Sequence, residues 1–366
     1  MSKENRLRLS ITFITLLLVI CGIYMVFSAS NVWAEAKFND KFYYFKRQSL
    51  FAGLGILGFI IASQIKTSFL KKHAFSIVLV TLVLLGLVLI PGLGIIRNGS
   101  RSWFGIGSFA FQPSELFKIA LVIYVSKILD EKYDQTKKIK GFLSIIFITL
   151  LGFLLIMLQP DFGTAIVMLA SIVVLMFTSR LPIKYYLIIG GLGVTMMVLL
   201  ILIAPYRFDR ITSFIDPWSD PLGTGFQIIQ SMYALGPGAL LGNGLLNSYQ
   251  KRFYLPEPQT DFIYAIVVEE FGLLGGILLL FAFGYLFYKG FKFASSRDDQ
   301  FSSFLITGLL GLIFIQVIIN LGVVVSLLPV TGITLPLISY GGSSLSVTLV
   351  SLGLVVGRKN KEKSEI

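Results

Sequence analysis

The sequence predicts an all-α integral membrane protein with about ten transmembrane helices and one large outer loop, at about 205–261, between the seventh and eighth helices. Three observations support this fold class. The mean hydropathy is +0.83 and only 14% of the 366 residues are charged, which is typical of a membrane protein. Apolar segments of roughly 20 residues, the length that crosses a bilayer, recur along the chain. Lysine and arginine are also distributed unequally between alternate connections.

The predicted spans form one polytopic domain over residues 1–366. They lie near residues 9–29, 47–65, 74–93, 113–129, 141–158, 163–180, 185–204, 262–288, 302–327 and 332–356. The first span follows basic residues and precedes small ones, as a signal peptide would. Its apolar run is too long for a signal peptide, so we expect an uncleaved span. Cys21 is the only cysteine, which excludes an internal disulfide and a thiolate metal cluster.

The basic residues predict the orientation of the chain. Of its 31 lysines and arginines, we assign twenty to the face that holds the N-terminus, ten to the opposite face and Lys118 to a span. Because positive residues are enriched on the cytoplasmic side, both termini should be cytoplasmic. The net charge of +12 then reflects this bias and contact with anionic headgroups. The basic residues are dispersed among short loops, which excludes a nucleic-acid partner.

The connection between the third and fourth spans carries a first group of candidate residues. It contains Arg101 and Trp103, and it leads through Pro113 into a span that holds Glu115 and Lys118. Glu115 and Lys118 are i,i+3 neighbours, so they either form a buried ion pair that fixes the helix or shape a ligand cavity. Trp103 is either an interfacial anchor or, beside Arg101, a surface on which a sugar ring stacks.

The outer loop and its neighbours carry the other candidates. Arg210 either binds a phosphate group, which arginine contacts well, or contacts headgroups. Asp161 follows Pro160 in a tight turn, for which we expect a structural role. Asp261 ends the loop immediately before the eighth span, which contains the adjacent acids Glu269 and Glu270. A carboxylate at the mouth of a membrane helix and near arginines suits chemistry on a polar, anionic substrate that is held in lipid.

Several ordered motifs together resemble the SEDS family (shape, elongation, division and sporulation). These motifs are Gln112-Pro113-Ser114-Glu115 with Lys118, Gln159-Pro160-Asp161, Asp216-Pro217-Trp218 through Gln227, Leu255-Pro256-Glu257 through Asp261, and Pro329 through Ser344. The similarity covers essentially the whole chain. The tryptophan of the third motif and the form of the fourth are closer to the FtsW and SpoVE branch than to RodA.

The resemblance implies a fold with ten spans in the bacterial cytoplasmic membrane. It also implies a peptidoglycan glycosyltransferase that polymerises lipid II, with a class B penicillin-binding protein as transpeptidase partner and other divisome or cell-wall proteins nearby. The essential aspartate of the family falls on Asp261 and its important outer-loop tryptophan on Trp103. Many relatives carry histidine two residues before that aspartate, where this chain has Gln259. The only histidine, His73, lies on the predicted cytoplasmic side.

For the implied reaction we expect Asp261 to be the base of an inverting glycosyl transfer. Arg210, Arg101 and Lys251 would offset the pyrophosphate charge, with a divalent cation (Mg²⁺ or Mn²⁺) as a possible cofactor, although no residue pattern defines a metal site. Trp103, Glu115, Lys118 and Glu257 complete the expected substrate site. Two alternatives stay open at this point. A lipid II flippase would use the acids and the lysine inside the spans, whereas a division scaffold would leave the outer acid–base cluster unexplained.

Overall fold

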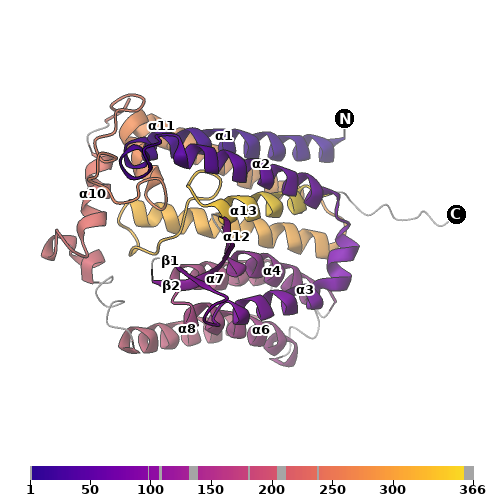
Figure 1. Ribbon diagram of the computed structural model, residues 1–366. Coiled ribbons are helices and arrows are strands. Elements are labelled where there is room, and N and C mark those ends of the chain that lie inside the picture. The colour runs from indigo at the N-terminus through magenta and orange to yellow at the C-terminus, as the bar shows by residue number, and fades with distance from the viewer. Residues whose placement is uncertain are drawn as a thin grey trace.

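A computed structural model describes residues 2–97, 99–106, 109–131, 139–179, 182–203, 212–236 and 239–357. In these residues, ten helices form a bundle of roughly parallel elements (Figure 1). They are α1 (Lys3–Phe38), α2 (Tyr43–Gln64), α3 (Thr67–Leu87), α4 (Pro113–Glu131), α6 (Ile139–Leu158), α7 (Phe162–Thr178), α8 (Ile183–Ile203), α11 (Ile263–Ala294), α12 (Gln300–Val324) and α13 (Gly342–Val355).

The helical membrane fold predicted from the sequence is confirmed, because each predicted apolar segment overlaps one of these helices. Within the described ranges, five helices are long and apolar enough to cross a membrane by themselves: α1, α2, α3, α11 and α12. The count of ten spans therefore stays a prediction. Many leucine, isoleucine and phenylalanine side chains point outward from the bundle, as a lipid solvent requires.

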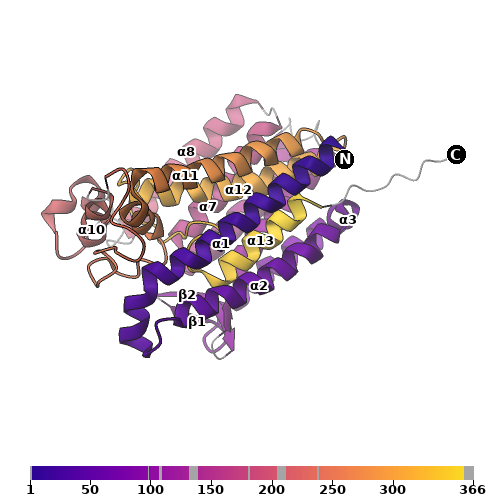
Figure 2. The same cartoon turned by 90° about the horizontal axis from the view of Figure 1, so that it is seen from above.

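The centre of the bundle is formed by α4 and α12. Helix α12 packs against α4, α7 and α11, while α13 packs along α2 and α1 packs along α11. Almost every residue of α4 is buried, including Glu115 and Lys118 in its first turns. The arrangement is clearest from above, where α13 lies between α1 and α2 (Figure 2). Glu115 and Lys118 are consequently held in the interior of the protein.

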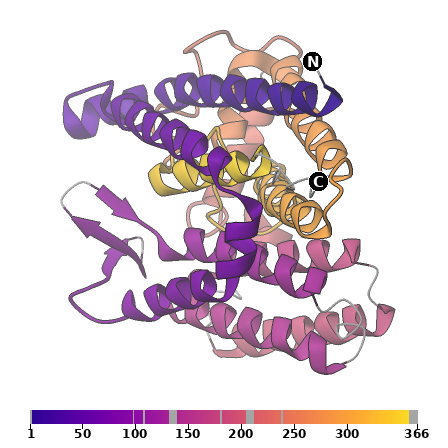
Figure 3. The same cartoon turned by 90° about the vertical axis from the view of Figure 1, so that its right-hand side faces the viewer.

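A small antiparallel sheet forms the connection between α3 and α4. Its strands are β1 (Ile95–Arg97), β2 (Ser100–Ile106) and β3 (Phe109–Phe111), in the order β1-β2-β3. Gly99 has φ of 79° and permits the tight turn between β1 and β2. The β1–β2 hairpin projects from the side of the bundle (Figure 3). The sheet places Arg97 and Trp103 beside the helix ends.

The prediction of a last helix over 332–356 is wrong at its N-terminal end. Helix α13 begins only at Gly342, and residues 325–341 form turns and extended backbone between α12 and α13. Pro329 and Pro336 lack the N–H that a helix needs, and Leu337 has φ of 67°. This segment therefore remains non-helical and contributes backbone groups to the interior.

Helix α11 is interrupted by Gly272, whose φ of 68° and ψ of −171° are not helical. Residues 239–244 of the outer loop bond to both sides of the break. Asn243 N donates to Glu269 O over 2.9 Å, and Leu273 N donates to Ala239 O over 2.9 Å. Gly242 packs directly against the break, where a side chain on either glycine would collide with the opposite backbone. The loop is thus built into the helix that follows Asp261.

The outer loop also contains a 3₁₀ turn, η1 (Pro217–Ser219), and the amphipathic helix α10 (Phe226–Leu235). Helix α10 lies at one end of the bundle in Figure 1, whereas α1 begins at the opposite end. Arg8, near the start of α1, donates to Gly357 O beyond α13 over 2.9 Å. The start of α1 and the end of α13 therefore share one face of the bundle, opposite α10.

Candidate functional site

A cavity of about 870 Å³ lies where several helix ends and connections meet. Its walls come from α2, the β1–β2 hairpin, α4, the turn between α6 and α7, the loop before α11, α12, the non-helical segment 325–341 and the start of α13. Carboxylates, cations, amides and hydroxyls line it together with apolar groups. Such a cavity, with a few convergent charged groups, is the usual form of a ligand or active site.

Glu115 and Lys118 form an ion pair on the cavity wall. Lys118 Nζ lies 2.8 Å from Glu115 Oε1, and both side chains are largely buried. The i,i+3 spacing on α4 places the two groups together, and Pro113 fixes where the helix begins. The buried ion pair of the first reading is present, and both residues also line the cavity, whose role in ligand binding stays a prediction.

Asp161 faces Glu115 and Lys118 from the turn between α6 and α7. Its Oδ1 accepts a hydrogen bond from Thr164 N over 3.1 Å and so caps α7, while its Oδ2 accepts one from Gln112 Nε2 over 2.6 Å. Desolvation raises the pKa of the Asp161 carboxyl, although the Thr164 hydrogen bonds and the charge of Lys118 oppose this effect. The predicted structural role is present, but Asp161 also lines the cavity, which the turn pattern did not reveal.

Asp261 and Glu257 lie on the wall formed by the outer loop. Thr260 Oγ1 lies 2.7 Å from Glu257 O and 2.9 Å from Asp261 Oδ1, so its single proton donates to one of these two acceptors at a time. The main-chain carbonyl of Asp261 accepts from Asn320 Nδ2 of α12 over 2.7 Å. Glu257 has φ of 43°, so the loop bends sharply there before it reaches Asp261. The carboxylate of Asp261 is thereby held at the N-terminal end of α11.

Two cavity arginines, Arg47 and Arg97, were not among the predicted site residues. The guanidinium carbon of Arg47 lies 4.5 Å from the centre of the Tyr43 ring, and that of Arg97 lies 5.4 Å from the centre of the Trp103 ring. These contacts orient the two planar cations. Arg47 lies near Tyr43 at the start of α2, and Arg97 lies near Trp103 at the end of β1. A cation close to an aromatic residue at the end of a helix or strand is a sequence pattern that could have indicated both arginines.

Of the three cations that we expected beside the substrate pyrophosphate, two lie outside the cavity and the third is not described. Lys251 is sealed inside the protein, where its Nζ lies 2.9 Å from Glu270 Oε1, so it does not reach the cavity that the described residues form. Arg101 Nη1 donates to Leu89 O over 3.3 Å, and Arg101 is likewise outside the lining of that cavity. A β-bulge interrupts the pairing of β1 and β2 between the pairs Ile95–Trp103 and Ile96–Arg101, so the regular alternation that would place Arg101 and Trp103 on one face is broken there. Arg210 lies outside the described residues.

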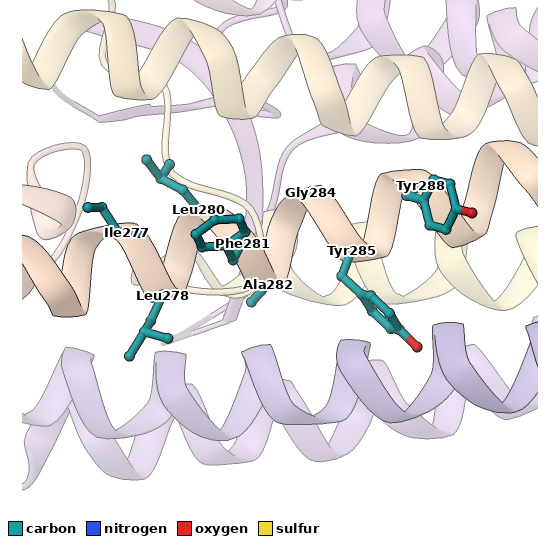
Figure 4. A pocket seen from close by; sticks show the side chains of 8 residues that line it. All are labelled: Ile277, Leu278, Leu280, Phe281, Ala282, Gly284, Tyr285 and Tyr288. Atoms are coloured by element: carbon teal, nitrogen blue, oxygen red, sulfur yellow. The ribbon is translucent and has the colours of Figure 1, made fainter.

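A second hollow, of about 820 Å³, follows the outer surface of α11. Figure 4 shows that the eight side chains around it, including Phe281, Tyr285 and Tyr288, all project from this one helix. They are apolar or aromatic, and no carboxylate or cation belongs to them. This hollow therefore offers no acid or base for chemistry, in contrast to the first cavity.

These features define a polytopic membrane protein with a charged cavity among its helix ends, and comparisons with known proteins agree. A family model described as "Cell cycle protein" (FTSW_RODA_SPOVE) matches residues 8–364. Stage V sporulation protein E of Bacillus subtilis is 47% identical over 97% of both chains. A probable peptidoglycan glycosyltransferase FtsW of Geobacter metallireducens is 40% identical over 99% of this chain and 97% of its own length.

Solved structures are similar as well. One chain comes from a structure described as the coordination of polymerization and crosslinking by a peptidoglycan synthase complex. It has a TM-score of 0.79 and 32% identity, over 94% of this chain and 95% of that one. The rod shape determining protein RodA of Thermus thermophilus gives a TM-score of 0.69 and 30% identity, over 94% of each chain. The protein belongs to the FtsW/RodA/SpoVE family, the SEDS family, as its motifs predicted.

Proposed function

We propose that this protein is a peptidoglycan glycosyltransferase that polymerises lipid II at the outer face of the bacterial cytoplasmic membrane, in cell division or spore formation. The observation that carries the proposal is the position of Asp261 in a cavity that also holds Arg47, Arg97 and Lys118. The names of the FtsW relatives and of the peptidoglycan synthase complex support this activity. The cavity has room for polar sugar and phosphate groups, which a purely structural scaffold would not need.

The proposed reaction is an inverting transfer with Asp261 as general base. The C4 hydroxyl oxygen of one sugar forms a bond to the anomeric carbon of another, while the bond from that carbon to the lipid pyrophosphate breaks. The hydroxyl proton passes to the Asp261 carboxylate, and the bonding electron pair leaves with the pyrophosphate. An unperturbed aspartate has a pKa of about 3.9, so the proton transfers late, once the hydroxyl has become acidic in the transition state.

Arg47 and Arg97 are the cations that we assign to the pyrophosphate, in place of Arg101 and Lys251. A guanidinium group can bind a phosphate through two parallel hydrogen bonds, and ring contacts already restrict both arginines. Lys118 has a smaller net effect because Glu115 neutralises much of its charge. Arg210 remains a prediction from the sequence. The role of the cations is to stabilise the charge that develops on the leaving group.

A divalent cation has no dedicated site in the described part of the chain, where no group of three His, Cys, Asp or Glu side chains is placed to hold a metal. Mg²⁺ usually binds one or two carboxylates together with substrate phosphates. Asp261 with the substrate pyrophosphate is a donor set of that kind. Bound there, the cation would supply additional positive charge, and we assign it no step of the reaction.

The proposed topology and partner follow from the same arrangement. The start of α1 and the end of α13 lie opposite α10, which agrees with cytoplasmic termini and an outward-facing loop. A class B penicillin-binding protein would bind the spans and supply the transpeptidase. The similarity to a chain from a complex that coordinates polymerization and crosslinking supports this partner.

The proposal is tested by glycan synthesis from purified lipid II in detergent, with the penicillin-binding protein partner present. Asp261→Asn should fold and bind the partner, but its rate should fall by about 10²–10⁴-fold, the usual contribution of a positioned base. Asp220→Asn is the matched control, because Asp220 is an exposed acid of the same loop outside the cavity. It should retain the wild-type rate.

Two results would contradict the proposal. Near-normal polymerisation by folded Asp261→Asn would exclude Asp261 as the base. Absence of polymer from the wild-type complex, together with lipid II transfer across vesicle membranes, would support the flippase alternative. Detergent separates the two activities because lipid II then reaches the cavity without having to cross a bilayer.

A further inference from the structure

Asn320 of α12 connects the main chain of Asp261 to the non-helical segment 325–341. Its side-chain Nδ2 donates to Asp261 O and to Ile333 O, over 2.7 Å in each case. The residue is 1% exposed and does not line the cavity that the described residues form. Asn320 is therefore in direct contact with the backbone of the proposed base but is not placed to touch the substrate.

The chemistry of the contact fixes the orientation of the amide. Both neighbours are carbonyl oxygens, which only accept hydrogen bonds, so the NH₂ group must face them. Asn320 Oδ1 has no partner among the described residues. A buried polar group inside a membrane helix costs free energy unless its hydrogen bonds repay it. The structure therefore shows the Asn320 side chain as a donor of these two hydrogen bonds.

Further hydrogen bonds join segment 325–341 to the loop before α11 and to α12. Tyr340 N donates to Gln259 O over 2.8 Å, just before Asp261 in the chain. One turn before Asn320 on α12, Gln316 Nε2 donates to Thr334 O over 3.3 Å. The loop before α11 and segment 325–341 are thus joined directly through Gln259 and indirectly through Asn320, and the Asn320 junction is the one that includes Asp261 itself.

We propose that Asn320 is a positioning residue for Asp261. This inference rests on the proposed function, in which Asp261 is the general base. The Asn320 amide immobilises the Asp261 carbonyl, and Thr260 Oγ1 lies 2.9 Å from the carboxylate oxygen Oδ1 of the same residue. Loss of the amide leaves Asp261 in the cavity wall but allows its backbone to move. Because reacting groups must lie within a narrow distance of each other, a small displacement slows the chemical step without abolishing substrate binding.

The test is steady-state glycan synthesis by the full chain with its transpeptidase partner. Asn320→Leu has a similar volume and removes both donated bonds. Its kcat should fall by about 10- to 100-fold, the range in which a displacement of about 1 Å acts. Its KM for lipid II should stay within about threefold of wild type, because the altered group does not touch substrate. Thr149→Val in α6 is the control, since the Thr149 hydroxyl bonds only to Ile145 O of its own helix.

A double variant shows whether the effect passes through Asp261. In an Asp261→Asn background, Asn320→Leu should lower the residual rate by less than about twofold, because no base remains to be positioned. Full additivity of the two losses would overturn the inference, and so would a loss confined to KM. If the rate per total protein falls by the same factor as the amount of folded protein, Asn320 has only a structural role, and the inference is overturned. Asn320→Asp, which keeps the shape but removes the amide donor, provides the same test if Asn320→Leu fails to fold.

The outcomes separate this inference from the proposed function. An active Asp261→Asn variant overturns the assignment of the base and, with it, the inference. An inactive Asp261→Asn variant combined with a wild-type kcat for Asn320→Leu overturns the inference alone. If both the Asp261→Asn and the Asn320→Leu variants are impaired and their losses are not additive, the results support the proposed function and the inference.

Discussion

Two buried glutamate–lysine pairs of this protein have nearly the same geometry but different surroundings. Lys118 Nζ lies 2.8 Å from Glu115 Oε1, and Lys251 Nζ lies 2.9 Å from Glu270 Oε1. The first pair lines the charged cavity, whereas the second is enclosed between α1, α11 and the outer loop. Ion-pair geometry alone therefore does not distinguish a functional charge from an architectural one.

The difference lies in what each pair connects. Glu115 and Lys118 belong to one helix, so their contact joins no separate elements. Glu270 of α11 accepts from Ser28 Oγ of α1 over 2.6 Å as well as from Lys251 of the outer loop. The pair thus ties three segments that are distant in the sequence. Charges enclosed between elements stabilise their arrangement, while charges beside a cavity are available to a ligand.

The carboxylate next to Glu270 extends the enclosed network. Glu269 accepts from Tyr249 N over 2.7 Å and from the Ser248 hydroxyl, both in the outer loop. Together with the break at Gly272, these bonds fasten the loop that leads to Asp261. The network supports the cavity wall without contributing to its surface. This is the role of Lys251, for which we had expected substrate binding.

The largest expected effect is on folding, from Lys251→Met. The substitution leaves the Glu270 carboxylate enclosed with Ser28 as its remaining side-chain hydrogen-bond partner, and an unpaired buried charge costs about 3–5 kcal/mol. The yield of monodisperse protein in detergent and its thermal unfolding midpoint should both fall sharply. Combining Lys251→Met with Glu270→Gln should restore much of the yield, because no charge is then stranded. A stable single variant would show that water reaches this pair.

An effect of intermediate size, on activity rather than folding, is expected from Lys118→Met. Glu115 borders the cavity and can be hydrated there, so the folded yield should stay close to wild type. Glycan synthesis should fall by about tenfold or more, because the cavity loses a cation near the developing negative charge. The measurement is the polymerisation rate normalised to monodisperse protein. Equal losses of yield in the Lys118 and Lys251 variants would remove the distinction between the two pairs.

The smallest expected effect concerns the pH dependence of stability at Asp161. Desolvation raises the pKa of this carboxyl in the folded protein above its unfolded value. The protonated form is therefore favoured by folding, and its stabilisation is lost as the pH rises from about 4 through the raised pKa. Asp161→Asn lacks this term and can still cap α7 through its side-chain oxygen. The difference in unfolding midpoint, variant minus wild type, should increase with pH between about 4 and 7. A constant difference would indicate an ordinary pKa and a well-hydrated carboxyl.

Much of the fold and part of the site could be predicted from the sequence. Apolar length indicated the membrane helices, because lipid demands continuous apolar segments whatever the tertiary contacts. The orientation inferred from lysine and arginine stays a prediction. Glu115, Lys118, Glu257 and Asp261 were indicated as charges in or beside spans, where a charge is costly, and Trp103 by the family motifs. All five line the cavity.

Only the tertiary structure decided which of the remaining charges meet. Arg47 of α2 and Arg97 of β1 are far from Asp261 in the sequence, and no local pattern shows that the fold brings them to one cavity with it. Lys251 precedes Asp261 by ten residues, yet the loop turns it inward to Glu270. The break of α11 at Gly272 likewise coincides with bonds from the distant backbone of residues 239–244. The periodicity and composition of a segment indicate whether it faces lipid, water or protein. The partners of a buried charge depend instead on how distant segments pack together, and no local sequence pattern specifies that packing.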